Sequence, residues 1–150
     1  YRRQRQMCIR DSVNIKGVYN CTAAVLPAMR ARGDGLIITT SSMAGKRYSR
    51  RAGVAYGASK HAVMAVNELL NLEESNYGIR ACAICPAEVN TAILDRRPVP
   101  VPAADRARLI QPEDIAETVV FVARLDPRVC INEILVTPTH KRAAQPGEPG

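Results

Sequence analysis

The sequence predicts an α/β fold built on a parallel sheet, and two observations lead to that class. Candidate helices and strands alternate along the chain, in the order helix, strand, helix, strand, helix, strand. The first candidate strand is a short β-branched run without polar alternation, a pattern typical of strands buried on both faces of a parallel sheet, and the second is also read as a buried strand. Three strands make only half of a doubly wound sheet, so we expect an incomplete one.

Three helices are expected, at 13–30, 55–74 and 111–125. Pro27 is placed to kink or end the first helix. The third begins with Pro112 in its first turn and with Glu113 and Asp114 at the positive end of the helix dipole. The faces expected to be buried consist, in chain order, of Val13, Gly17, Cys21, Ala24 and Val25, then Ala62, Val66, Leu69 and Leu70, then Ile115, Val119 and Val122.

Three strands are expected between and after these helices, at 36–42, 79–89 and 130–139. A turn at 32–35 leads into the first strand, and Gly78 is suited to a left-handed residue after the second helix. Residues 91–110 are irregular and Pro-rich, so a loop with a short helix is expected there. No G-x-G-x-x-G phosphate loop follows any of the strands.

The two ends of the chain differ from the part between them. Residues 1–12 show no helical or strand period, and "RRQRQMCIRDS" resembles translated sequencing-adapter read-through, so we exclude them from the fold. The native chain would then be longer at its N-terminus. Residues 141–150 form a low-complexity tail that we expect to be disordered. The folded unit is therefore expected at 13–140.

Composition and charge exclude several function classes. The net charge is +7, but the first twelve residues hold four Arg and one Asp and so account for +3 of it. Five Tyr, one Phe and no Trp leave little for stacking on nucleic-acid bases. No apolar run is long enough to cross a membrane. Five Cys without a secretion signal favour reduced thiols in a cytoplasmic protein.

Tyr56 and Lys60 stand four residues apart in the predicted helix 55–74 and so share one face. A cation about 4 Å from a phenol stabilises its charged form by roughly 4 kcal/mol at an effective dielectric near 20, and burial opposes this. Such a phenol can exchange a proton near neutral pH. Ser42 ends a strand at the edge where open α/β sheets place ligands, and its hydroxyl can polarise a carbonyl oxygen. Taken alone, Y-x-x-x-K also suits an exposed helix surface.

Four segments carry a resemblance to a known family. "VNIKGVYN" resembles a V-N-x-x-G segment, "GLIITTSSMAG" a G-x-I-x-x-x-S-S-x-A-G strand, "YGASK" a Y-x-A-S-K motif and "CPAEVNT" a P-G-x-V-x-T turn. From about Val13 to Thr139 the chain thereby resembles the short-chain dehydrogenases/reductases. The resemblance implies the C-terminal half of a Rossmann-like, doubly wound parallel sheet. It also implies catalytic roles for Asn14, Ser42, Tyr56 and Lys60, and cofactor contacts from Tyr56, Lys60, Pro86, Ala87, Val89 and Thr91.

The implied reaction is hydride transfer between a nicotinamide cofactor, NADP or NAD with a slight preference for NADP, and a small carbonyl or alcohol substrate. Tyr56 would give the proton, Lys60 would hold the ribose hydroxyls, Ser42 would bind the substrate oxygen, and Asn14 would position a relay water. No metal is implied. The family commonly associates through its two long helices, so a homodimer or homotetramer through 13–30 and 55–74 is expected once the fold is complete.

Two departures from the family pattern matter. Ala87 stands where the family usually has Gly. The family's N-terminal Gly-rich cofactor loop, ribose selector and N-A-G segment should precede Val13, and this chain does not contain them. We therefore expect the chain by itself to be inactive. Two alternatives stay open: an inert or partly folded half domain, and a sugar-nucleotide epimerase, whose larger C-terminal substrate domain is lacking here.

Two other patterns suggest chemistry less strongly. Cys82 and Cys85 form C-x-x-C, but a spacing of three in a strand points the two side chains to opposite faces, which favours a structural interpretation over a redox or metal site. The basic loop "KRYSRR" at 46–51 could bind an anion, and a solvated loop is the preferred interpretation.

Overall fold

The computed structural model describes residues 8–9, 11–48, 52–97 and 99–140. The expectations for most of the opening segment, for the tail 141–150 and for the end of the basic loop lie outside these residues. The elements, in chain order, are the π-helical turn η1 (Asp11–Lys16), α2 (Gly17–Arg32), β1 (Gly35–Thr40), η2 (Met43–Gly45), α3 (Val54–Glu74), η3 (Ser75–Tyr77), β2 (Ile79–Pro86), η4 (Ala92–Arg96), α4 (Ala103–Arg106), α5 (Pro112–Ala123) and β3 (Glu133–Val136).

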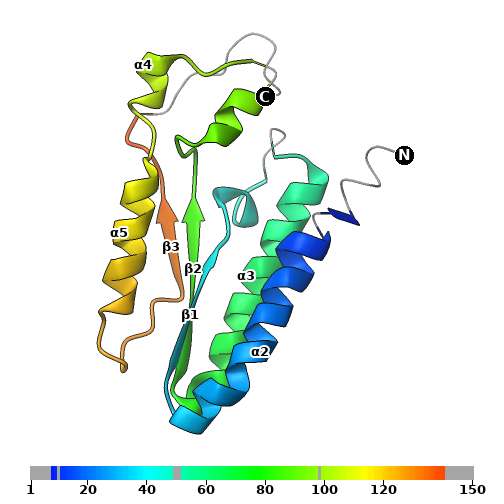
Figure 1. The fold of residues 1–150 in the computed structure, drawn as a ribbon, viewed down its shortest axis with the longest axis vertical. Helices are drawn as coiled ribbons and strands as arrows, with labels where there is room; N and C mark the ends of the chain where they lie inside the picture. The colour runs from blue at the N-terminus through cyan, green and yellow to red at the C-terminus, as the bar shows by residue number, and fades with distance from the viewer. Residues whose placement is uncertain (1–7, 10, 49–51, 98, 141–150) are drawn as a thin grey trace.

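The strands form one parallel sheet in the order β1-β2-β3, which confirms the predicted α/β class. Gly35 pairs with Ile79 at the start of β1 and β2, and Ala83 of β2 pairs with Glu133 at the start of β3. Figure 1 shows α2 and α3 side by side on one face of the sheet and α5 on the other. The carboxyl ends of all three strands therefore meet at one edge, which the chain leaves after Thr40 of β1 and after Pro86 of β2.

The core between α5 and the sheet agrees with the sequence prediction. Cys82, Ile84 and Val122 are buried together, and Ile115 and Val119 pack against them. The helix begins as predicted, with Pro112 in its first turn. Gln111 and Asp114 form a capping box, in which each side chain bonds the other residue's backbone N–H.

Burial differs between the strands. Seven of the eight residues of β2 are buried, as expected for a central strand. β1 has a hydrogen-bonded neighbour on one side only among the described residues, so Leu36 to Thr39 are half-buried and Thr40 is exposed. The expectation that this strand is buried on both faces is therefore wrong, because an edge strand lacks the cover that a second neighbouring βα unit provides.

The predicted buried face of the first helix is also wrong. Val13 is 65% and Val25 41% exposed, whereas Thr22 is the buried residue of α2. Apolar side chains occur on both sides of this helix, so periodicity alone does not select the face that packs on the sheet. Pro27 does not end the helix, which continues to Arg32 and closes at Gly33 with a left-handed φ of 65°.

The buried face of α3 is shifted in the same way and is partly polar. Leu69, predicted to be buried, is 51% exposed. The buried residues are instead Ser59, Val63, Asn67, Leu70 and Glu74. The polar members are tolerated because each of them bonds to another element: Ser59 to η1, Asn67 to the residue before β3, and Glu74 to Arg30 of α2. Gly78 follows η3 with a φ of 70°, as predicted.

Residues 91–110 hold two short helical segments, η4 and α4, where one short helix was expected. Leu94, Val101 and Leu109 form a separate small core inside this region. Two ion pairs involve side chains of this region, Arg97 with Glu88 and Arg106 with Asp95. Among the described residues, no helix is both long and apolar enough to span a membrane.

Candidate active site

Tyr56 and Lys60 lie one turn apart at the start of α3. The Lys60 ammonium is 5.8 Å from the centre of the Tyr56 ring, so the two side chains share a face as their spacing predicts. Lys60 Nζ also donates a hydrogen bond of 2.9 Å to the carbonyl oxygen of Thr40, the last residue of β1. Burial lowers the pKa of Lys60. The cation is thereby held between the helix and the carboxyl end of β1.

The segment after β1 packs against the turn of α3 that carries Lys60. Ser42 accepts a hydrogen bond from the backbone N–H of Ala44 at 3.1 Å, so its own O–H remains able to donate. Ser41 is 3% exposed and donates to the Lys60 carbonyl oxygen at 3.1 Å. A Cβ on Gly45 would lie 2.7 Å from that same oxygen. Only a glycine allows the backbone after Ser42 to approach the helix this closely.

Asn14 reaches the site from η1. Its Nδ2 donates to Ser59 Oγ at 3.0 Å, and Ser59 Oγ donates to the backbone carbonyl of Tyr56 at 2.9 Å. Ser59 is only 2% exposed, so this relay is shielded from water. The π-helical turn at Asp11–Lys16 presents Asn14 to α3, and such turns often occur at functional sites.

The predicted cofactor segment leaves the same edge of the sheet one strand further on. Pro86 ends β2, and the Ala87 N–H donates to the Val136 carbonyl of β3 at 2.8 Å. Val89 forms a parallel bridge with Ile110, and Thr91 is exposed just before η4. Contacts with each other or with the neighbouring Ser41 and Ser59 therefore connect four predicted catalytic residues: Asn14, Ser42, Tyr56 and Lys60. The predicted cofactor residues from Pro86 to Thr91 are connected to these four only by the pairing of β2 with β1.

Two residues of this region, Ser41 and Ser59, were not singled out from the sequence, and a third, Cys85, was considered there only as part of the C-x-x-C pattern. Ser41 and Ser59 hold the backbone of Lys60 and Tyr56, and each stands inside a quoted motif, S-S and Y-x-A-S-K, which is the signal that could have identified them. Cys85 lies beneath the Ser41–Ser42 turn, with its Sγ 3.4 Å from Met64 Sδ. Burial raises the pKa of the Cys85 thiol, and hydrogen bonding from both serines opposes that rise.

Cys82 and Cys85 point to opposite faces of β2, as the spacing predicts. Cys82 belongs to the core under α5, whereas Cys85 contacts Met64 of α3. Burial raises the pKa of Cys82 to about 11, so its thiol is protonated and unreactive near neutral pH. No group of three or more His, Cys, Asp or Glu in the described ranges could hold a metal ion. In the basic loop, Lys46 pairs with Glu133 of β3 at 2.7 Å.

Comparison with known proteins gives one consistent result. Residues 6–99 match the family model described as short chain dehydrogenase. Oxidoreductase UcpA of Escherichia coli K12 is 37% identical over 115 residues, which are 77% of this chain and 40% of UcpA. The closed form of serine dehydrogenase complexed with NADP+ superimposes with a TM-score of 0.75 at 27% identity, covering 90% of this chain and 57% of that one.

A second solved structure agrees with the first. The 3-oxoacyl-[acyl-carrier protein] reductase of Brucella melitensis, with bound NAD, has a TM-score of 0.74 at 25% identity and covers 89% of this chain and 50% of that one. The chain thus spans 40% of UcpA and about half of each solved structure. The three-stranded sheet corresponds to part of the Rossmann-like sheet of those proteins.

Proposed function

This chain belongs to the short chain dehydrogenase family, and on that premise we propose that it carries the catalytic residues of an NAD(P)-dependent oxidoreductase. The substrate class proposed is a small carbonyl or alcohol compound. The observation that carries the proposal is the Tyr56–Lys60 pair, with the ammonium 5.8 Å from the phenol ring and bonded to Thr40 at the carboxyl end of β1. Open α/β sheets bind their ligands at that edge.

In the proposed reaction each residue has a role that its contacts support. Tyr56 donates the proton that the carbonyl oxygen takes up, and the neighbouring ammonium of Lys60 stabilises the phenolate left behind. Ser42 donates its O–H to the same oxygen, since its Oγ already accepts from Ala44. Asn14 orients the first turn of α3 through Ser59. The family resemblance further assigns to Asn14 the water that returns a proton by way of Lys60.

The residues present fit one end of a nicotinamide cofactor. Lys60 offers an ammonium and Tyr56 a hydroxyl at the sheet edge, a donor set suited to ribose hydroxyls. The remaining contacts proposed are Pro86, Ala87, Val89 and Thr91, which follow β2. When bound, the cofactor supplies or accepts the hydride. Similar solved proteins hold NADP+ or NAD, so a nicotinamide cofactor is proposed for this chain without a choice between the two.

Activity should be measured on this chain and on a chimera that joins the preceding part of UcpA to Val13. We expect the chimera to oxidise NADPH or NADH with a panel of ketones and aldehydes, followed by absorbance. Tyr56→Phe should lower kcat about 100-fold or more, because it removes the proton donor. Tyr77→Phe, in η3 beyond the opposite end of α3, should keep the rate. Full activity of Tyr56→Phe would refute the assignment.

We also propose that the completed protein is a homodimer or homotetramer through α2 and α3. The support is a group of exposed apolar side chains on these helices, among them Tyr19 at 64%, Leu69 at 51% and Leu72 at 70% exposure. We expect these side chains to contribute to the interface, because exposed apolar patches on soluble proteins are typical of protein interfaces. Light scattering of the chimera should give a dimer or larger, and Leu72→Glu should shift it toward the monomer. A monomeric chimera would contradict the proposal.

A further inference from the structure

The segment between Asn90 and Gln111 is attached to the sheet mainly through its two ends. Its small core of Leu94, Val101 and Leu109 is separate from the core under α5. Within the described part of the chain, neither η4 nor α4 packs extensively on another helix or strand. Figure 1 shows these two elements beyond the carboxyl ends of the strands. The position of the segment relative to the sheet therefore depends on the contacts where it begins and where it ends.

Those two ends meet at the side chain of Gln111. Gln111 Oε1 accepts a hydrogen bond of 2.9 Å from Asn90 Nδ2, at the beginning of the segment. Gln111 Nε2 donates to the Arg106 carbonyl at 3.1 Å and to the Leu109 carbonyl at 2.9 Å, at the end of the segment. The Asn90 N–H also donates to the Ile110 carbonyl at 2.8 Å. We call the two amide side chains the Asn90–Gln111 clasp, because together they hold both ends of the segment in one place.

The orientation of the Gln111 amide is fixed by its partners. Nε2 has two hydrogens, and both are donated to carbonyl oxygens, so the amide cannot turn over without placing Oε1 against two acceptors. The backbone of Gln111 is held as well, because Asp114 Oδ2 accepts from its N–H at 2.8 Å at the start of α5. Oε1 therefore faces Asn90, and only a hydrogen-bond donor at that position suits it.

We propose that Asn90 and Gln111 are positioning residues, which hold Thr91 in place at the carboxyl edge of the sheet. Thr91 follows Asn90 directly, and its carbonyl accepts from the Leu94 N–H at 3.0 Å at the start of η4. The bonds of the clasp involve none of the residues proposed for catalysis, so it acts through the backbone of Thr91 and not on the reacting atoms. The link to a cofactor rests on the proposed function, in which Thr91 is a cofactor contact.

Amide hydrogen exchange on the full chain, followed by NMR, tests the clasp without cofactor or substrate. Leu94 is 1% exposed, and its N–H reports on the backbone of Thr91. Gln111→Leu removes all three side-chain bonds of Gln111, so the Leu94 N–H should exchange about tenfold faster or more. Asn90→Asp keeps the size of the side chain but replaces the donor that faces Oε1 by an acceptor, and it should also accelerate this exchange.

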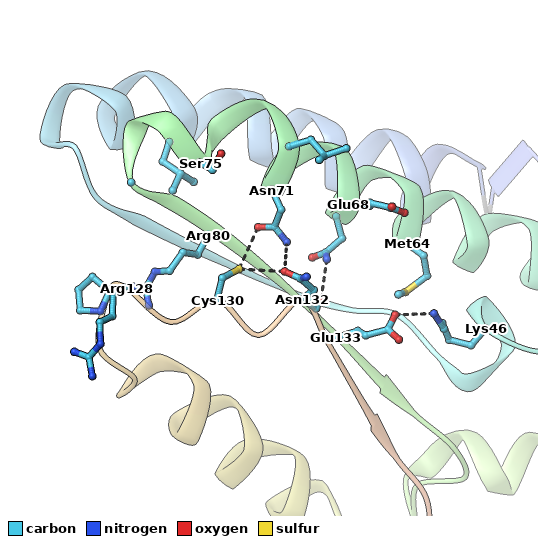
Figure 2. A pocket seen from close by; sticks show the side chains of 15 residues that line it. Lys46, Met64, Glu68, Asn71, Ser75, Arg80, Arg128, Cys130, Asn132 and Glu133 are labelled. Atoms are coloured by element: carbon cyan, nitrogen blue, oxygen red, sulfur yellow. Dashed lines mark hydrogen bonds and ion pairs between the residues drawn. The ribbon is translucent and has the colours of Figure 1, made fainter.

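Asn132→Ala serves as the comparison variant at the other end of the sheet. It also breaks a hydrogen bond between two side-chain amides, in which Asn71 Nδ2 donates to Asn132 Oδ1 at 3.0 Å. Figure 2 shows this bond between α3 and the residue that precedes β3. Because it lies at the amino end of β3, Asn132→Ala should leave the exchange of the Leu94 N–H unchanged.

Kinetics of the chimera test the effect on the cofactor. Gln111→Leu and Asn90→Asp should raise KM for NADPH or NADH about fivefold or more and keep kcat within about twofold, because a displaced Thr91 weakens binding without touching the proton donor. A variant that merely unfolds shows the opposite split, since fewer active molecules lower the apparent kcat and leave KM as it was. Asn132→Ala should change neither constant by more than about twofold.

Two results would overturn the proposal. They are equal exchange of the Leu94 N–H in the parent and in both clasp variants, and faster exchange accompanied by an unchanged KM. An inactive parent chimera would instead refute the proposed function, and the exchange rates would still decide whether the clasp holds Thr91. If Gln111→Leu does not fold, Asn90→Asp decides alone, because it removes only one bond of the clasp.

Discussion

Gly45 is the position where a single methyl group should disturb the candidate active site most directly. A Cβ there would lie 2.7 Å from the Lys60 carbonyl oxygen, 2.7 Å from Ser41 Oγ and 3.0 Å from the Lys60 carbonyl carbon. Two of these atoms belong to the backbone of α3 and cannot rotate away. Gly45→Ala must therefore push the turn 41–45 away from the helix.

The loss in free energy of unfolding that Gly45→Ala causes follows from these contacts. Overpacking of this kind costs about 1–3 kcal/mol. Losing the Ser41–Lys60 hydrogen bond adds about 0.5–1.5 kcal/mol. The free energy of unfolding should fall by about 1.5–4.5 kcal/mol. Urea denaturation followed by circular dichroism measures it, and in the chimera the same variant should reduce kcat because the Ser42 and Lys60 groups move apart.

Gly57→Ala is the matched control, because it adds the same methyl group at a position that is in α3 and twelve residues after Gly45. The nearest atom to a Cβ there is the Ala44 carbonyl oxygen at 3.9 Å, which is an ordinary contact. Alanine is favoured over glycine inside a helix by about 0.5–1 kcal/mol, so this variant should be as stable as the parent or more so. If Gly45→Ala unfolds at the same urea concentration as the parent, the close packing of this turn on α3 is refuted.

Two further predictions concern how α3 is fixed to the rest of the fold. Asn71→Leu should lower the free energy of unfolding by about 1–3 kcal/mol or more, because the Ala81 N–H loses its partner and the Ala81 carbonyl keeps only the weak thiol donor of Cys130; equal urea midpoints would contradict this. The hydrogen bonds and charge of Arg30 lower the pKa of Glu74, so its contribution to stability is present above the ordinary carboxyl pKa and lost as the pH falls through the lowered one. Glu74→Gln should therefore be less stable at pH 7 and lose less stability on acidification, which thermal melts from pH 7 to pH 3 would measure; parallel pH curves would refute the coupling.

The elements that the sequence predicts correctly are those with a strong local signal. α5 combines a proline at its start, acidic residues in its first turn and one unambiguous apolar face, and each of these is found in the structure. β2 is an uninterrupted apolar run and is buried along almost its whole length. Gly78 adopts the left-handed conformation that its place after a helix predicts. These features depend on neighbouring residues in the chain, so no distant contact is needed to predict them.

The errors occur where two faces of an element could both be buried. α2 carries apolar residues around its circumference, and the sheet selects the side that holds Thr22. α3 buries Asn67 and Glu74 in preference to Leu69, because Asn132 and Arg30 from distant segments satisfy the two polar groups. Periodicity assigns buried positions to apolar residues and cannot anticipate a partner that lies 44 or 65 residues away.

The candidate site likewise has one part that the local sequence predicts and another that depends on contacts between distant segments. The spacing of Tyr56 and Lys60 already places both on one helix face, and helical geometry alone requires this. That Lys60 bonds the end of β1, and that Asn14 reaches Tyr56 through Ser59, follow from the packing of three separate elements. Asn71 also depends on tertiary packing. Its side chain bonds Ala81 at the edge of β2 where β3 begins to pair two residues later, at Ala83. The Asn71 amide therefore takes the place of β3 beside Ala81, which β3 does not reach.

By itself, the sequence determined the alternation of helices and strands, the parallel sheet and the pairing of a phenol with an ammonium, because backbone periodicity and short-range spacing control all three. The tertiary structure decided which helix faces are covered and which polar groups are buried with partners. These outcomes depend on segments that are distant in the chain and adjacent in space, and their energies exist only after the chain has folded.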